Sequence, residues 1–216
     1  MSEQTVAAQL VALSGETTSP AYITDAGVFT EYVAADDRYL FVYREHGIEA
    51  GVVEVTALED LDRSDWAVRA FALAGQYDRD AYAEVVNVPV DLLVTATPLR
   101  ETDFPLSVVK VLAVDPDYQS RGIGSELSAI VAAELFKHPP VVTMLWLRDN
   151  PANVKIAESY SEFILARFDD YFPDDWQCPD CGLENPCTCS VAMYGWFADG
   201  RGLDEEERPV VAEASD

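Results

Sequence analysis

The chain has 216 residues, of which 49% are hydrophobic, so it can form one globular domain with a substantial core, or one domain with an insertion. Its 39 acidic residues face only 14 basic ones, and the net charge of -25 argues against direct nucleic-acid binding, where a basic patch is the expected footprint. No apolar run approaches membrane-spanning length and the N-terminus lacks a basic-then-apolar signal, so we expect no membrane contact and a cytoplasmic protein.

The first part of the chain is expected to contain a helix and a hairpin. Residues 1–20 carry three apolar residues at helical spacing and are predicted to form a short helix or an arm. Residues 39–43 and 48–58 are rich in strand-forming residues. The segment Arg44-Glu45-His46-Gly47 joins them, which predicts a β-hairpin.

Residues 58–104 are longer than a tight connection between sheet neighbours needs, and we interpret them as an inserted segment. Within them the spacing of apolar residues predicts helices at 62–75 and 80–86 and a strand at 90–97. Either that strand or residues 48–58 can pair with the strand that follows, and both orders stay open. Because the segment is rich in aromatic residues, it is either a substrate-facing flap or a helical cover over the sheet.

The most informative stretch is a strand, a loop and a helix. Residues 108–114 form a nearly continuous apolar run, typical of a strand buried on both faces, and Asp115-Pro116-Asp117 ends it. The segment Gln119-Ser120-Arg121-Gly122-Ile123-Gly124 then opens an amphipathic helix. Its glycines let an anion approach the backbone, and the helix start supplies unpaired amides and a positive dipole end. Arg121 can add a charged fork, so the stretch predicts a phosphate-binding site.

Residues 112–127, Leu-Ala-Val-Asp-Pro-Asp-Tyr-Gln-Ser-Arg-Gly-Ile-Gly-Ser-Glu-Leu, resemble the cofactor signature of the GCN5-related N-acetyltransferases (GNATs). In that family the loop amides hold the pyrophosphate of acetyl-coenzyme A. The resemblance implies an α/β fold with a mixed, twisted sheet flanked by helices over about residues 39–197. It also implies cofactor contacts from Leu112, Ala113, Val114, Gln119, Ser120, Arg121, Gly122, Ile123, Gly124 and Ser125. The alternative is an ordinary strand–turn–helix, although packing alone does not require Gln, Arg and two glycines together.

A second strand and helix are expected after this motif. Residues 141–147 are predicted to form a buried strand. Asn150 is a good N-cap and Pro151 suits the first helical position, so a helix is predicted over residues 151–167.

The resemblance resumes within this predicted helix. Asn153 and Tyr160 have the spacing of the family's Asn-x-x-Ala-x-x-Leu-Tyr segment, which implies that Asn153 contacts the cofactor arm and that Tyr160 lies near the leaving sulfur. The family usually continues with Gly-Phe, where this chain has Ile164-Leu165, so we expect the helix to run on and the end of the acceptor site to be rebuilt.

The implied reaction is direct attack of an amine on the thioester in a ternary complex. A tetrahedral oxyanion forms and coenzyme A leaves as a thiolate, to which the phenol of Tyr160 can donate a proton. The backbone amide of Val114 or Leu112, at the splayed end of the cofactor strand, can hold the oxyanion. Glu54 is a candidate general base, although it is equally plausible as an exposed strand residue. Tyr160 can also be a core aromatic.

All four cysteines are confined to two short motifs, unlike anything in the family. Cys178-Pro-Asp-Cys181-Gly forms a knuckle that places two thiolates on one turn, and Cys187 and Cys189 can complete a tetrahedron. In a cytoplasmic chain a metal is favoured over disulfides. Four thiolates leave no open position, so the ion is expected to be structural, zinc first and iron second. A last strand is expected at 190–197, and the metal would pin the loop before it near the acceptor entrance.

The expected organisation is an arm or short helix (1–20), a GNAT-like acyltransferase domain (21–198) that contains the inserted segment (58–104) and the four-cysteine metal loop (176–190), and a disordered acidic tail (199–216). The expected function is transfer of an acetyl group from acetyl-coenzyme A to an amine on a small molecule or protein, and a homodimer is left open. The alternatives are a non-catalytic acyl-coenzyme A sensor and an interaction protein that uses the cysteine–metal knuckle.

The acidic residues are spread along the chain rather than gathered in one block. This distribution is typical of the solvated surfaces of salt-loving archaea more than of a site for a basic partner. Because salt screens repulsion between like charges, we expect the melting temperature to rise between low and molar salt. Thermal melts in the two buffers test this expectation, and equal stability in both would count against a halophilic origin.

Overall fold

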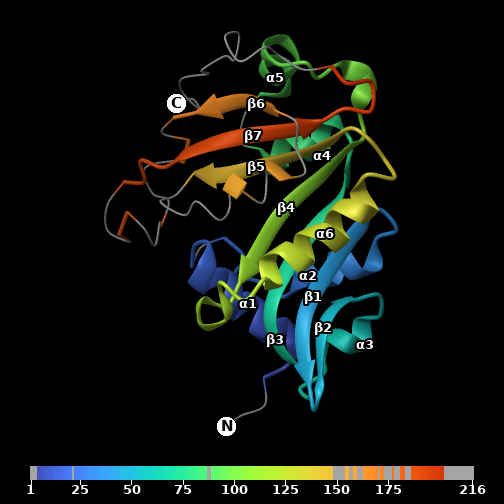
Figure 1. The fold of residues 1–216 in the computed structure, drawn as a ribbon, viewed down its shortest axis with the longest axis vertical. Helices are drawn as coiled ribbons and strands as arrows, with labels where there is room; N and C mark the ends of the chain where they lie inside the picture. The colour runs from blue at the N-terminus through green and yellow to red at the C-terminus, as the bar shows by residue number, and fades with distance from the viewer. Residues whose placement is uncertain are drawn as a thin grey trace.

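The computed structural model describes residues 4–20, 22–86, 89–147, 154–155, 158–159, 163–169, 171–172, 177, 181–182 and 186–201. Its strands are β1 (Arg38–His46), β2 (Glu49–Glu54), β3 (Ala67–Tyr77), β4 (Leu106–Val114), β5 (Val141–Leu147), β6 (Phe163–Phe168) and β7 (Ser190–Trp196). They form one seven-stranded sheet in the order β2-β1-β3-β4-β5-β7-β6 (Figure 1). β4 and β5 run parallel, and all other neighbours run antiparallel.

Helices cover both faces of the sheet (Figure 1). They are α1 (Val6–Thr17), α2 (Gly27–Ala34), α3 (Leu58–Leu61), α4 (Arg79–Val85), α5 (Val90–Ala96) and α6 (Ile123–Leu135), with 3-10 turns η1 (Glu101–Asp103) and η2 (Pro116–Tyr118). α6 packs on one face of β1, β3 and β4, and α1 and α2 pack on the opposite face. α4 and α5 cover the half formed by β5, β7 and β6. None of the helices in the described ranges is long and apolar enough to cross a membrane.

The fold class is confirmed: the sheet is mixed and helices flank it. α1, α4, α6, β4, β5 and β7 lie where the sequence predicted them, and β1 and β2 form the predicted hairpin. α2 and α3 have no counterpart among the predicted elements.

The predicted helix at 62–75 is wrong, because this stretch forms most of β3, which lies between β1 and β4 at the centre of the sheet. The apolar residues that suggested one helical face divide between two sides of the strand. Leu73 packs with the α1 and α2 side, whereas Ala74 packs with α6. β3 is also the antiparallel partner of β4, so neither of the two predicted pairings occurs.

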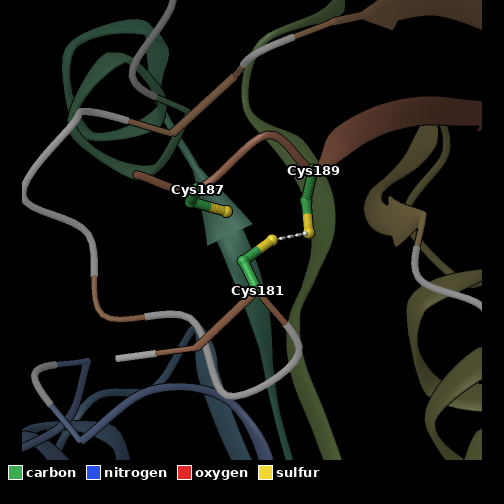
Figure 2. Close-up of side chains that lie close together, drawn as sticks. All are labelled: Cys181, Cys187 and Cys189. Atoms are coloured by element: carbon green, nitrogen blue, oxygen red, sulfur yellow. Dashed lines mark hydrogen bonds between the residues drawn. The ribbon is translucent and has the colours of Figure 1, made fainter. Parts of the chain in front are cut away.

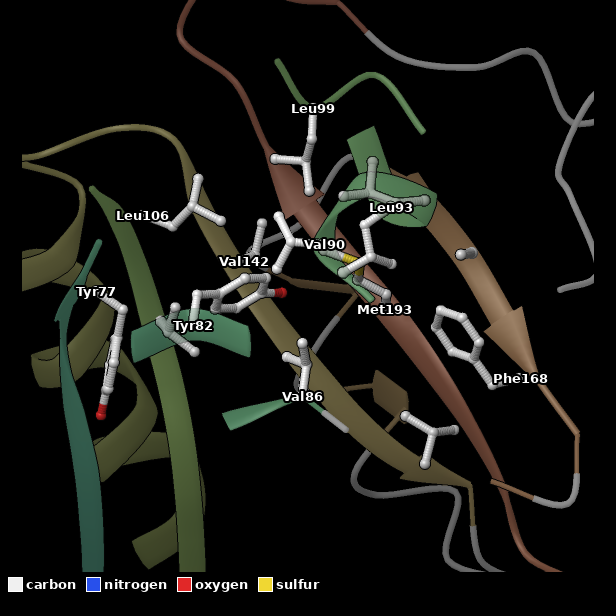
Figure 3. Packing of buried hydrophobic residues seen from close by; sticks show 14 of the residues in the cluster. Tyr77, Tyr82, Val86, Val90, Leu93, Leu99, Leu106, Val142, Phe168 and Met193 are labelled. Carbon is white, nitrogen blue, oxygen red and sulfur yellow. The ribbon is translucent and has the colours of Figure 1, made fainter. Parts of the chain in front are cut away.

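The predicted strand at 90–97 is wrong as well, because the chain forms α5 there. Leu93 is fully buried, and its amide donates to the carbonyl of Pro89 at the helix start. The cluster that receives it combines Tyr82 of α4 with Phe168 and Met193 of the last two strands (Figure 3). α5 is therefore a cover over the sheet, which was one of the two alternatives for this segment.

The predicted helix over 151–167 does not run on to its expected end. Residues 154–155 and 158–159 are helical, but Phe163–Phe168 is β6, an edge strand paired with β7. Its register shifts at Leu165, which forms a bulge, and a Cβ on Gly195 of β7 would lie only 2.5 Å from Leu165 Cδ1. The side chain of Leu165 therefore needs a glycine beside it, which explains how the apolar pair Ile164-Leu165 fits a strand.

Candidate cofactor and acceptor site

β4 and β5 separate after a short common stretch. They share three residue pairs, the last of which is Val109↔Thr143, whereas β5 stays paired with β7 as far as Leu147↔Ser190. Figure 1 shows the two strands diverging from this point. From Lys110 onward one edge of β4 therefore has no partner in β5, and its backbone groups can bind an extended ligand. The splay predicted for this strand is thus present, and its contact with a cofactor stays a prediction.

A β-bulge lies at the point of separation. Leu73 pairs with Val111 and Ala74 pairs with Val109, so Lys110 has no partner on β3. The bulge places Lys110 and Val111 on the same face of the sheet: Val111 packs with the α1 and α2 cluster, and Lys110 Nζ lies 6.0 Å from the ring centre of Tyr32 on α2. A bulge bends and twists its strand, which accounts for the divergence of β4 from β5.

The loop after β4 exposes backbone amides at the start of α6. Gly122 is the N-cap residue with φ +83°, and Ser120 also has a positive φ of 61°. No side chain from the described residues caps this helix, so its first amides are available to an anion. A Cβ on Gly122 would meet nothing within 4 Å, so the space in front of the cap is open. This geometry suits the predicted phosphate site.

Two predicted cofactor residues bond to backbone carbonyls nearby, one in the loop and one at the end of β4. Arg121 Nη2 donates to the carbonyl of Asp117 over 2.8 Å, and the guanidinium lies 4.4 Å from the ring centre of Tyr118. Gln119 Nε2 donates to the carbonyl of Val114 over 3.3 Å. An arginine has five N–H donors, so the bond to Asp117 leaves others for a phosphate.

Arg69 and Glu45 anchor this loop to the sheet, and sequence reasoning missed both. Arg69 Nε lies 2.9 Å from Glu45 Oε2, Arg69 Nη1 lies 3.6 Å from Asp115 Oδ2, and the guanidinium lies 4.4 Å from the ring centre of Tyr118. The Tyr118 hydroxyl donates to Glu45 over 3.2 Å. No local motif predicts this network, because its members come from β1, β3 and η2.

The other predicted site residues are not all brought to this edge. Glu54 pairs with Phe41 on β1, which pairs with Ala72 on β3, which pairs with Leu112 on β4. Three strand spacings of about 4.8 Å thus separate Glu54 from Leu112. Partial burial raises the pKa of Glu54, and the negative charge of nearby Glu134 raises it further. Its role as general base stays a prediction, and this placement adds no support to it.

Asn153, Tyr160 and Cys178 lie outside the described residues. Their predicted roles, a contact with the cofactor arm, proton donation to the sulfur and metal ligation, therefore stay predictions.

A group of tyrosines includes Tyr32, whose ring lies near Lys110 at the bulge. The hydroxyls of Tyr32 and Tyr77 share a hydrogen bond, and burial raises the pKa of both. Burial also raises the pKa of Tyr171 to about 12. Burial raises the pKa of Tyr22 most strongly, and the nearby Tyr77 and Tyr171 raise it further. These groups are therefore neutral phenols at neutral pH.

Three cysteines lie together in the segment between β6 and β7 (Figure 2). The Sγ atoms of Cys181, Cys187 and Cys189 all lie within 4.8 Å of one another, and the Cys181 and Cys189 sulfurs are 3.5 Å apart. Cys187 is buried. The amide of Tyr171 donates to the carbonyl of Cys189 over 3.4 Å, so the thiol cluster is linked to the tyrosine group.

No protein-family model matches the sequence, and no curated protein matches it. Solved structures do. The chain is similar to Arabidopsis thaliana NAA60, crystallised with acetyl-CoA, at a TM-score of 0.54 and 12% identity, over 90% of this chain and 94% of that one. It is similar to Chaetomium thermophilum Naa20, crystallised with a bisubstrate analogue, at a TM-score of 0.56 and 10% identity, over 94% of this chain and 90% of that one. It is also similar to an N-acetyltransferase from Staphylococcus aureus Mu50, at a TM-score of 0.50 and 13% identity, over 88% of this chain and 90% of that one. The chain therefore has the fold of the GCN5-related N-acetyltransferases.

Proposed function

We propose that this protein is an N-acetyltransferase of the GCN5-related family, which moves an acetyl group from acetyl-CoA to an amine by direct attack in a ternary complex. The observation that carries this proposal is the opened edge of β4, which runs directly into a loop whose helix begins at Gly122. An elongated ligand with peptide-like amides at one end and phosphates at the other fits this sequence of features. The structures of NAA60 with acetyl-CoA and of Naa20 with a bisubstrate analogue support the choice of ligand.

In this proposal the cofactor follows β4 and the loop. The pyrophosphate binds the amides of residues 122–125 with help from Gln119, Ser120 and Arg121, and the arm lies along residues 112–114. The amide of Leu112 or Val114 holds the developing oxyanion, which is worth most where the donor is already in place.

Coenzyme A binding tests the proposal directly. Isothermal titration in molar-salt buffer is expected to show one site per chain, and acetyl-CoA is expected to acetylate at least one amine in a panel of spermidine, lysine and peptides that begin with Met, Ser, Ala or Gly. Absence of coenzyme A binding at millimolar concentration would end the enzymatic interpretation. Binding without turnover of any amine would favour the acyl-coenzyme A sensor.

Tyr160→Phe separates an enzyme from a sensor. Loss of a general acid typically slows catalysis by about 100-fold or more, so kcat is expected to fall by about that factor while the coenzyme A affinity is unchanged. Steady-state kinetics and calorimetry measure the two quantities. Tyr39→Phe, on β1, is the matched control, and we expect it to leave kcat unchanged. Full activity in Tyr160→Phe would show that Tyr160 serves the core instead.

We also infer that Cys181, Cys187 and Cys189 hold a structural zinc ion, with Cys178 as the fourth ligand. Sulfurs bound to tetrahedral zinc at about 2.3 Å lie about 3.8 Å apart. The separation of 3.5 Å between the Cys181 and Cys189 sulfurs is close to that value and far from the disulfide length of about 2.05 Å. The bound ion would fix the loop that carries Tyr171, through the bond of Tyr171 to Cys189.

A further inference from the structure

Lys110 occupies a singular position among the three lysines of this chain. Lys137 and Lys155 are exposed, whereas Lys110 is half-buried and is the bulged residue at the point where β4 leaves β5. An acidic protein has many exposed positions for a lysine, and a bulge at a functional edge re-aims the side chain it carries. The placement of Lys110 therefore calls for a functional reason.

The surroundings of Lys110 favour its neutral form. Among the described residues no carboxylate oxygen lies within 4.0 Å of its amine. The groups that face it are Glu31 and Tyr32 on α2, Arg38 on β1, and the hydroxyl pair of Tyr32 with Tyr77 on β3. Burial lowers the pKa of Lys110, the positive charge of Arg38 lowers it further, and Glu31 opposes them.

We propose that Lys110 is the general base of the acetyl transfer, and that it deprotonates the incoming ammonium group from the face of β4 that carries Tyr32. This inference rests on the proposed function. The bulge places Lys110 at the start of the opened edge, next to the stretch of β4 along which the thioester lies in that function, and its amine lies 6.0 Å from the ring centre of Tyr32. The face that carries it is the one that α1 and α2 cover, opposite to α6, so the base and the phosphate-binding helix approach the reacting carbon from different sides.

Each proton in the transfer has a donor and an acceptor. The ammonium of the acceptor gives one proton to the neutral amine of Lys110, and the freed lone pair attacks the thioester carbon. The C–N bond forms, the C–S bond breaks, and the second proton of the attacking nitrogen finishes on the sulfur of coenzyme A. Lys110 then releases its proton to solvent. A lysine serves as a base only when its environment holds it neutral near the working pH, which burial and Arg38 favour here.

Carbon-13 labelling of the lysine ε-carbons tests the protonation state without any acceptor, because the chain has only three lysines and Lys110→Arg identifies the signal. Lys110 is expected to titrate at a clearly lower pH than Lys137, whose contact with Glu134 raises its pKa. Co-titration of the two signals in the presence of coenzyme A would overturn the proposal.

Kinetics test the role itself. In Lys110→Met, kcat/KM for the best amine of the panel is expected to fall about 100-fold, and the rising limb of its pH profile, which follows the pKa measured by NMR, is expected to disappear. Lys110→Arg carries a permanent positive charge and accepts no proton, so it is expected to be equally inactive. Activity close to wild type in Lys110→Arg would assign Lys110 a purely electrostatic role and overturn the proposal.

Two measurements keep this inference separate from the proposed function. Lys110→Met and the exposed-lysine control Lys137→Met are both expected to bind coenzyme A like the wild type, and Lys137→Met is expected to keep its turnover. If the wild type binds no coenzyme A, the proposed function fails. If the wild type is active and Lys110→Met shares its rate and pH profile, only the assignment of Lys110 fails.

Discussion

Replacing Gly122 with valine is expected to weaken coenzyme A binding by about 100-fold, which corresponds to about 2.7 kcal/mol. Gly122 has φ +83°, a conformation that a β-branched residue adopts only at a cost of about 1–2 kcal/mol, so the cap would shift away from its present geometry. The valine side chain would also fill the open space in front of the first amides of α6. Both changes act where the pyrophosphate would bind.

Gly47→Val is the matched control for that experiment. Gly47 lies in the turn between β1 and β2 and has φ +61°, and a Cβ at this position would likewise meet nothing within 4 Å. The substitution therefore carries a similar backbone cost outside the loop that opens α6. Calorimetric titration with coenzyme A and a thermal melt of each variant separate binding from stability. Equal coenzyme A affinity in the two variants would remove Gly122 from the binding site.

Removing the proposed zinc ion is expected to lower the melting temperature by on the order of 10 °C, because structural zinc contributes several kcal/mol and each kcal/mol shifts a domain of this size by about 2–4 °C. Cys187→Ser is expected to have the same effect, since Cys187 is buried beside the other two thiols. Inductively coupled plasma mass spectrometry is expected to find one zinc ion per chain in the wild type.

A chelator provides the internal control for the cysteine experiment. It is expected to bring the wild type to the stability of Cys187→Ser and to leave that variant unchanged. A wild type that contains no metal and is destabilised by a reducing agent instead would replace the zinc site with a disulfide.

The strand, loop and helix of residues 108–136 were predictable because every signal in them is local. The Asp-Pro turn ends β4, and a glycine stands where α6 needs a residue with positive φ. β3 was not predictable in this way. Its residues are buried on both faces between β1 and β4, so the alternation that marks a strand is missing, and Leu73 and Ala74 mimic one helical face although they point to opposite sides.

The candidate site likewise combines features that local sequence signals reveal with features that depend on pairing across the sheet. The predicted phosphate loop is evident from its motif, whereas the proposed role of Lys110 emerges only from pairing across the sheet, because a bulge is defined by the partner strand. Arg69 and Glu45 are separated by 24 positions and meet because β1 and β3 are neighbours. The β-branched side chains of α5 favour a strand locally, and the cluster that this segment covers makes it a helix instead.

The separation of β4 from β5 has a mechanical consequence. Within the described ranges, only three residue pairs join the two halves of the sheet directly, with the cluster around α4 and α5 as a second link. A cofactor arm bonded to the free edge of β4 would act as a strand supplied from outside, and it would restrict rocking of one half against the other. Occupancy of this edge would then also restrict β6 and Tyr171, so the predicted acceptor entrance beside them would become rigid only after the acyl donor has bound.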